Sequence, residues 1–214
     1  MKNFFNLIFF SVIFSCNVDE VYIDVFDPVQ ARIDSINQRT DDKNLIFSYL
    51  DRNSIYSYDT TNVGVFYSVI NEGENQIFPE VNDIVSINIA GYYTNDSIFF
   101  TNDSIDLVIF DTNVQSLAED IGYYDPTKYY SPLVYTYNGL GSFFPVVSDH
   151  GYLAQLSDFK IALGNSLSKI SEKGKVKILM PSGNAYGNSG NTNNPVIPEN
   201  VILIFDVHLI KIRK

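Results

Sequence analysis

The side chains that most often carry nucleophilic or metal chemistry are scarce in this sequence. Its 214 residues include one cysteine, Cys16, and two histidines, and there is no tryptophan. These are too few for a cysteine-rich zinc site or a disulfide framework. His208 follows Asp206 at the two-residue spacing of a strand and His150 follows Asp149, so we expect a surface Asp206–His208 pair and a solvated His150. The sequence therefore predicts a function that needs no metal, no cofactor and no reactive nucleophile.

Acidic residues outnumber basic ones. There are 25 Asp and Glu residues against 14 Lys and Arg, which gives a net charge of −11, while 45% of the residues are hydrophobic and 14% are aromatic. A negative chain repels the phosphate backbone, so we expect no nucleic-acid partner. The apolar content is sufficient for a folded core, and the length suits one main domain with an N-terminal appendage.

Residues 1–15 have the pattern of a bacterial secretion signal. One lysine precedes an apolar run of about a dozen residues, which is too short to cross a bilayer as a helix. The junction Ile13-Phe14-Ser15-Cys16 resembles a lipoprotein cleavage box, in which the cysteine becomes the lipidated first residue. A plain secretory signal with a cysteine nearby is the alternative. We expect an extracytoplasmic protein whose lipid at Cys16 anchors it to a bacterial membrane, on the periplasmic side or at the cell surface.

Residue spacing predicts an α+β fold for the rest of the chain. From Pro28, apolar residues at helical spacing predict two short helices separated by a polar break at 40–42. Alternating apolar residues predict strands within 63–70, 85–89, 175–180 and 201–212, and apolar residues within 163–170 predict one short helix packed on the sheet. A capping-box pattern at 112–115 predicts a further helix that ends at Gly122, and residues 123–157, rich in Tyr, Gly and Pro, predict a surface flap.

Three motifs in the last third of the chain resemble one known family. They are Lys173–Gly187, which contains Pro-Ser-Gly-Asn-Ala-Tyr-Gly, then Val196-Ile197-Pro198, then Leu203–Leu209. In this order they resemble the C-terminal half of FKBP-type peptidyl-prolyl isomerases, and residues 64–67 and 83–91 look like that family's first core strands. The resemblance spans residues 60–212 and implies an FKBP-like antiparallel sheet wrapped around a short helix. The expected organisation is a signal peptide (1–15), a tether with a helical segment (16–59) and an FKBP-like domain (60–214) with an insertion at 94–157.

The resemblance implies a site built from apolar and aromatic side chains. Tyr186 matches the tyrosine that holds the substrate carbonyl, and Asp111 is the expected catalytic acid. The expected substrate-binding residues are Phe110, Leu163, Val196, Ile197 and Phe205. Leu163 stands where the family has a tryptophan and Ile89 where it has a tyrosine, which implies a shallower pocket and reduced activity.

The alignment of this chain with the family stays open at two places. Counting directly on from Gly91 places the family's Phe-Asp pair at Phe99-Phe100, which lacks the acid, whereas a longer hairpin places it at Phe110-Asp111, which we expect. The rim before Leu163 maps either to Phe159-Lys160 or to Phe143-Phe144.

A site of this kind breaks no bond. Resonance in the amide gives a rotation barrier of about 18–20 kcal/mol, and a dry pocket that binds the twisted amide better than the planar forms lowers it. We expect a prolyl isomerase that assists the folding of exported proteins, with proline-containing polypeptides as partners. The alternatives are a catalytically weak binding or chaperone lipoprotein of the same fold, and a surface lipoprotein that binds a glycan or protein partner through Tyr129, Tyr135 and Tyr137.

Overall fold

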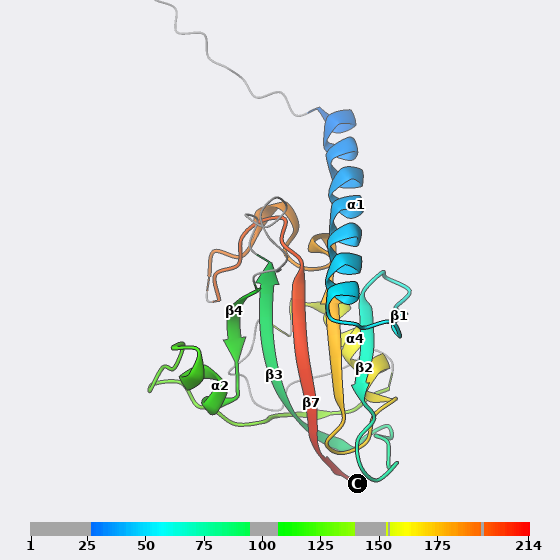
Figure 1. The fold of residues 1–214 in the computed structure, drawn as a ribbon, viewed down its shortest axis with the longest axis vertical. Coiled ribbons are helices and arrows are strands. Elements are labelled where there is room, and N and C mark those ends of the chain that lie inside the picture. Colours follow the sequence, from blue (N-terminus) through cyan, green and yellow to red (C-terminus); the bar gives the residue numbers. More distant parts are fainter. Residues whose placement is uncertain (1–26, 95–106, 140–152, 154, 194) are drawn as a thin grey trace, which may run out of the picture.

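The computed structural model describes residues 27–94, 107–139, 153, 155–193 and 195–214. In this part of the chain, seven strands form one antiparallel sheet in the order β1-β2-β6-β7-β3-β4, and β5 also pairs with β3 (Figure 1). The strands are β1 (Asp59–Thr60), β2 (Phe66–Asn71), β3 (Ile84–Thr94), β4 (Leu107–Thr112), β5 (Leu133–Thr136), β6 (Lys175–Met180) and β7 (Leu203–Arg213). The helices are α1 (Pro28–Arg52), α2 (Gln115–Asp120) and α4 (Ser157–Leu167), with short 3₁₀ helices η2 (Ser182–Asn184) and η3 (Gly187–Ser189). The expected α+β class with an antiparallel sheet is confirmed.

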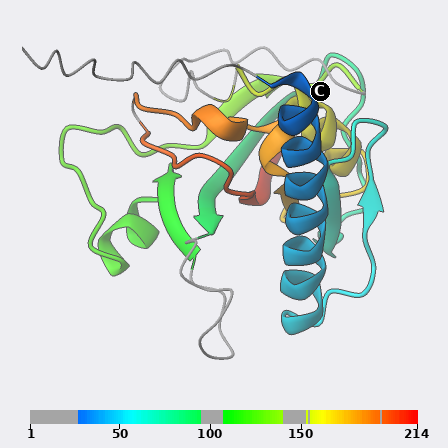
Figure 2. The same ribbon diagram turned by 90° about the horizontal axis from the view of Figure 1, so that it is seen from above.

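Alternation along β7 divides the side chains between the two faces of the sheet. Leu203, Phe205 and Val207 are buried on the face that packs against α4, which we call the inner face. The residues between them point to the outer face, where Ile204 is buried in the cluster formed with α1. Asp206, also on the outer face, is not part of that cluster and is partly exposed. The two helices therefore lie on opposite faces of one sheet (Figure 2).

Helix α4 overlaps the short helix that the sequence predicted within 163–170, but it begins earlier than expected and ends at Leu167. Its buried positions Phe159, Ala162, Leu163 and Leu167 recur every three or four residues and so form one stripe. That stripe packs against the inner face within a single core cluster.

The two short helices expected after Pro28 are wrong, because α1 is one continuous helix of 25 residues. The polar residues that suggested a break find partners in the helical conformation. The Thr40 hydroxyl donates to the carbonyl of Ile36 at 3.0 Å. Asp42 is 2% exposed and accepts hydrogen bonds from the backbone N–H and the hydroxyl of Ser182, both at 2.7 Å.

The C-terminal half of α1 is part of the packed fold. Ile46, Tyr49 and Leu50 pack over Leu179 and Ile204 on the outer face. The N-terminal half projects beyond the end of the sheet (Figure 1). Asp27 caps this end by accepting the backbone N–H of Val29 at 2.9 Å and of Gln30 at 3.3 Å.

Helix α2 begins later than the capping-box pattern predicted. Thr112 ends β4, where its hydroxyl donates to the carbonyl of Ile89 at 2.9 Å and accepts the N–H of Val114 at 3.1 Å. The Thr112 hydroxyl, which the pattern assigned to the N-cap of the helix, thus bonds across the strands instead. The helix stops before Gly122, whose φ of +71° favours glycine, as expected.

The surface flap expected at 123–157 is wrong for residues 133–137. Residues 133–136 form β5, and Tyr135 and Tyr137 are each 4% exposed in the inner-face core. Every second residue from Leu133 points inward, a strand period that the flap's turn-rich composition obscured. Tyr129 is 71% exposed and alone of the three tyrosines offers a ring to a partner.

Several sequence-based expectations lie outside the described residues: Cys16, Phe99-Phe100, Phe143-Phe144 and His150. None of the helices within the described residues has the length and apolar character needed to span a bilayer.

Candidate active site

Phe110 and Phe205 meet on the inner face beside a glycine. Their ring centroids are 5.8 Å apart and the planes are perpendicular. They belong to β4 and β7, which flank β3, and Gly91 of β3 lies opposite both Phe205 and Asp111 in the sheet register. A Cβ atom on Gly91 would lie 2.5 Å from Cζ of Phe110. The absence of a side chain at Gly91 is what allows the Phe110 ring to lie over β3.

Further aromatic and aliphatic side chains complete this cluster. The ring of Phe159, from α4, lies 4.4 Å from that of Phe205, and Tyr93 stacks on Phe110 at 6.4 Å. Leu163 and Ile197 belong to the same core and are 1% and 2% exposed. Aromatic pairs of this geometry add about 0.5–1.5 kcal/mol to the effect of burial, so the cluster holds its members firmly.

Tyr186 packs against the edge of the cluster. Its hydroxyl is buried and has no hydrogen-bond partner among the described residues. Burial raises the pKa of Tyr186, so the phenol stays protonated and remains a donor at neutral pH. A buried polar group without a partner costs about 1–3 kcal/mol, which a ligand carbonyl at this position would offset.

The turn before Tyr186 is held by side-chain hydrogen bonds. Besides the Asp42–Ser182 contact, the side-chain amide of Asn184 donates to the carbonyl of Val63 at 2.9 Å and to Asp158 at 2.8 Å. These bonds connect η2 to α1, to the segment before β2 and to α4. The backbone that carries Tyr186 is therefore preorganised.

Asp111 directly follows Phe110 and is 5% exposed. Its carboxylate forms an ion pair with Lys128. Tyr123 donates its hydroxyl to the carbonyl of Phe110 at 2.7 Å and so ties this end of β4 to the segment after α2. Burial, together with the negative charge of Asp111, raises the pKa values of Tyr123 and Tyr135. Sequence reasoning missed Lys128, because a lone lysine in a Tyr-rich and Pro-rich segment carries no periodic signal.

The structure brings together most of the residues that the sequence predicted for the site. Phe110, Leu163, Ile197 and Phe205 are members of one core cluster, with Tyr186 at its edge. Val196 differs, because it is 68% exposed while its neighbour Ile197 is buried and bridges to Asn191 in extended backbone. Successive residues in extended backbone point in opposite directions, so Val196 does not join the cluster.

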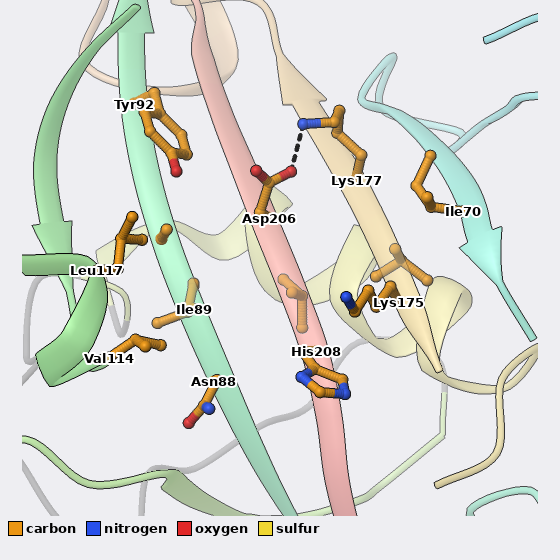
Figure 3. Close-up of a pocket in the computed structure, with 13 residues that line it drawn as sticks. Ile70, Asn88, Ile89, Tyr92, Val114, Leu117, Lys175, Lys177, Asp206 and His208 are labelled. Atoms are coloured by element: carbon orange, nitrogen blue, oxygen red, sulfur yellow. Dashed lines mark hydrogen bonds and ion pairs between the residues drawn. The ribbon is translucent and has the colours of Figure 1, made fainter. Parts of the chain in front are cut away.

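A separate cavity of about 420 Å³ lies on the outer face (Figure 3). Asp206 forms an ion pair there with Lys177, which lies directly opposite it in the register, and not with His208 as expected. Tyr92, Val114 and Leu117 line another side of the cavity.

The outer cavity is lined by two lysines, Lys175 and Lys177, and one carboxylate, Asp206. Burial alone would lower the pKa of Lys177, but Asp206 raises it overall. Burial and nearby Lys175 lower the pKa of His208, so its imidazole is neutral at pH 7. The cavity thus presents an ion pair, the ammonium of Lys175 and a neutral imidazole, and the described residues form no cluster suited to a metal ion.

The chain's neighbours in fold are FKBP-type peptidyl-prolyl isomerases, the family that the sequence motifs resemble. They include FkpA from Escherichia coli, with 22% identity, coverage of 86% of this chain and 68% of that chain, and a TM-score of 0.42. A peptidyl-prolyl cis-trans isomerase from Pseudomonas syringae has 16% identity, coverage of 88% and 98%, and a TM-score of 0.45. The N-terminal domain of FKBP42 from Arabidopsis thaliana has 15% identity, coverage of 74% and 93%, and a TM-score of 0.45.

No protein-family model matches the chain, and no curated protein matches it in sequence. Identities and TM-scores this low concern the fold only. The function has to be argued from the residues of this chain.

Proposed function

We propose that the protein is a peptidyl-prolyl cis-trans isomerase whose active site is the inner-face cluster with Tyr186 and Asp111. The observation that carries the proposal is the buried Tyr186 hydroxyl, which has no partner among the described residues and lies beside a dry aromatic cluster. A donor of this kind suits the carbonyl of an X-Pro amide. The sequence motifs around Tyr186 and Phe205 support the same assignment.

The proposed mechanism is differential binding of the twisted amide. Planar amides gain from resonance that places negative charge on the carbonyl oxygen, and water stabilises that charge. A dry site removes most of this solvation, because the single hydrogen bond from Tyr186 that positions the carbonyl replaces the several that water donates to it. Asp111, held by Lys128, contributes a fixed negative charge beside the aromatic rings.

Access to the site involves movement of side chains. Phe205 is fully buried and Ile197 is 2% exposed. A proline ring therefore reaches Phe205 only when neighbouring side chains shift. The apparent affinity is then the affinity of the open state multiplied by the fraction of molecules in that state. A low kcat/KM is the expected consequence.

The test is a protease-free prolyl isomerisation assay on the chain from residue 17. We expect the Tyr186→Phe variant to lose about three- to tenfold in kcat/KM, the equivalent of one hydrogen bond. Its stability should not fall, and it should rise by up to about 1–3 kcal/mol, because the hydroxyl that is removed is buried and has no partner among the described residues. Tyr129→Phe is the matched control, since Tyr129 is 71% exposed and is not a member of the cluster. A folded wild type that does not accelerate isomerisation would exclude the enzyme.

A binding or chaperone module is the second candidate, and the full burial of Phe205 favours it. In that case the wild type would suppress aggregation of an unfolded protein without accelerating isomerisation, and Tyr186→Phe would leave that suppression unchanged.

Lipid anchoring at Cys16, with exported polypeptides as substrates, is part of the proposal. It predicts that a labelled fatty acid is incorporated by the wild type and not by Cys16→Ala, and that the wild type fractionates with membranes.

A further inference from the structure

A second pocket lies between α1, the segment from β1 to β2, and η2. Its volume is about 530 Å³. It is lined by Arg39, Lys43, Phe47, Tyr58, Thr60, Val63, Gly64, Phe66, Pro181, Gly183 and Asn184. We call it the α1 pocket. Its lining residues include none of those assigned to the isomerase site.

The only charged side chains that line the α1 pocket are Arg39 and Lys43. They are four residues apart on α1 and so lie on the same side of the helix. Neither forms an ion pair with any residue that the structure describes. The nearby carboxylate of Asp42 is turned inward to Ser182 and Gln38 and is 2% exposed. Two cations thus face one pocket in a chain whose net charge is −11.

Three aromatic rings form one wall of the pocket. Phe47, Tyr58 and Phe66 contact one another with centroid distances of 5.7, 5.9 and 6.1 Å. Phe47 and Tyr58 remain 37% and 41% exposed. The ammonium of Lys43 lies 5.5 Å from the centre of the Phe47 ring, so an aromatic surface and a positive charge are adjacent.

Two glycines, Gly64 and Gly183, form another part of the pocket lining. A Cβ atom on Gly64 or Gly183 would meet no atom within 4 Å, so a ligand can approach the backbone closely at both positions. The hydrogen bonds from Asn184 to Val63 and Asp158 hold this part of the lining in place. A preorganised lining reduces the entropy that binding has to overcome.

We propose that the α1 pocket binds a polypeptide segment in which a carboxylate lies next to an aromatic side chain. The aromatic ring would pack on Phe47 and Tyr58, and the carboxylate would lie between Arg39 and Lys43. The charge of the lining selects an acidic segment, and the exposed rings select its aromatic neighbour. This inference does not depend on the isomerase activity.

The experiment is an NMR titration of the full-length chain with two capped peptides. The probe is acetyl-Gly-Asp-Phe-Gly-amide, and its uncharged counterpart has Asn in place of Asp. We expect the Asp peptide to shift the amide signals of Gly64 and Gly183 with saturation, and the Asn peptide to bind about two- to fivefold more weakly, as for the loss of one exposed ion pair. Affinity should fall as salt is raised, because these charges are solvent-exposed.

Variants of three exposed α1 residues complete the test. Arg39→Gln and Lys43→Gln should each weaken binding of the Asp peptide by about two- to fivefold. Arg32→Gln is the matched control, because Arg32 is an exposed residue of the same helix that does not line the pocket. The proposal is overturned if the two peptides bind equally, if Arg32→Gln weakens binding as much as Arg39→Gln, or if no signal near the pocket shifts. None of these readouts changes if the isomerase assignment fails.

Discussion

Replacing Gly91 by alanine tests the placement of the Phe110 ring over β3. The new Cβ atom would lie 2.5 Å from Cζ and 2.8 Å from Cε2 of Phe110, whereas carbon atoms in contact are about 3.5–4.0 Å apart. The φ of Gly91 lies outside the left-handed region, so the substitution adds no backbone strain. The ring has to move by about 1 Å to restore contact distance.

The surrounding side chains oppose that movement. Phe110 is 3% exposed and is held by Phe205, whose ring is perpendicular to it, and by Tyr93, whose ring stacks on it. Overpacking of this kind costs about 1–3 kcal/mol. For a chain of this size each kcal/mol lowers Tm by about 2–4 °C, so we expect Gly91→Ala to melt about 2–12 °C below the wild type.

Thermal and urea unfolding of a double-mutant cycle measures this effect. Leucine at position 110 lacks the outer ring atoms that the new Cβ would meet. The double variant Gly91→Ala/Phe110→Leu should therefore be destabilised by at least about 1 kcal/mol less than the sum of the two single variants. Gly183→Ala is the control, since its new Cβ meets nothing within 4 Å, and it should leave stability within about 1 kcal/mol of the wild type. Additive single effects, or an unchanged Gly91→Ala, would refute the placement of the ring.

Two further predictions concern hydrogen-bonded carboxylates, the buried Asp42 and the partly exposed Glu172. Asp42→Ala should lower the free energy of unfolding by about 1–3 kcal/mol, because the Ser182 N–H loses its partner, while exposed Asp41→Ala should change it by less than about 0.5 kcal/mol. The N–H of Ile212, with help from Lys211, lowers the pKa of Glu172 below its ordinary value of 4.5. The stability that Glu172 contributes is therefore present above pH 4.5 and lost as the pH falls through the lowered pKa. In urea unfolding, Glu172→Gln should therefore have a lower free energy of unfolding than the wild type at pH 7, and this difference should vanish in acid.

Short-range patterns were sufficient to predict the central strands and α4. The period of two in β6 and β7 and the helical spacing of Leu163 and Leu167 come from the direct burial of side chains, so the sequence shows them without further information, whereas the first part of α4, with Phe159, was not predicted. The longer hairpin that places Phe110 on the inner face agrees with the contact between Phe110 and Phe205. The roles assigned to Asp111 and Tyr186 stay predictions.

Features that depend on distant contacts were missed. The continuity of α1 through Asp42 rests on Ser182, 140 residues away, and no local pattern indicates that partner. Tyr135 is buried only because β5 pairs with β3, and Lys128 has a role only because it meets Asp111. Local propensity gave the wrong result at these positions because tertiary contacts decide them.

The Asp42–Ser182 contact links the two proposed sites physically. The turn that begins at Ser182 forms a wall of the α1 pocket and leads directly into Tyr186. Because Asp42 holds this turn against α1, the helix that provides the cations of the pocket also fixes the backbone before the isomerase hydroxyl. Loss of Asp42 should therefore weaken both peptide binding and isomerisation, whereas Tyr186→Phe should affect isomerisation alone. A helix that precedes the FKBP-like motifs in the sequence is in this way part of the framework of both sites.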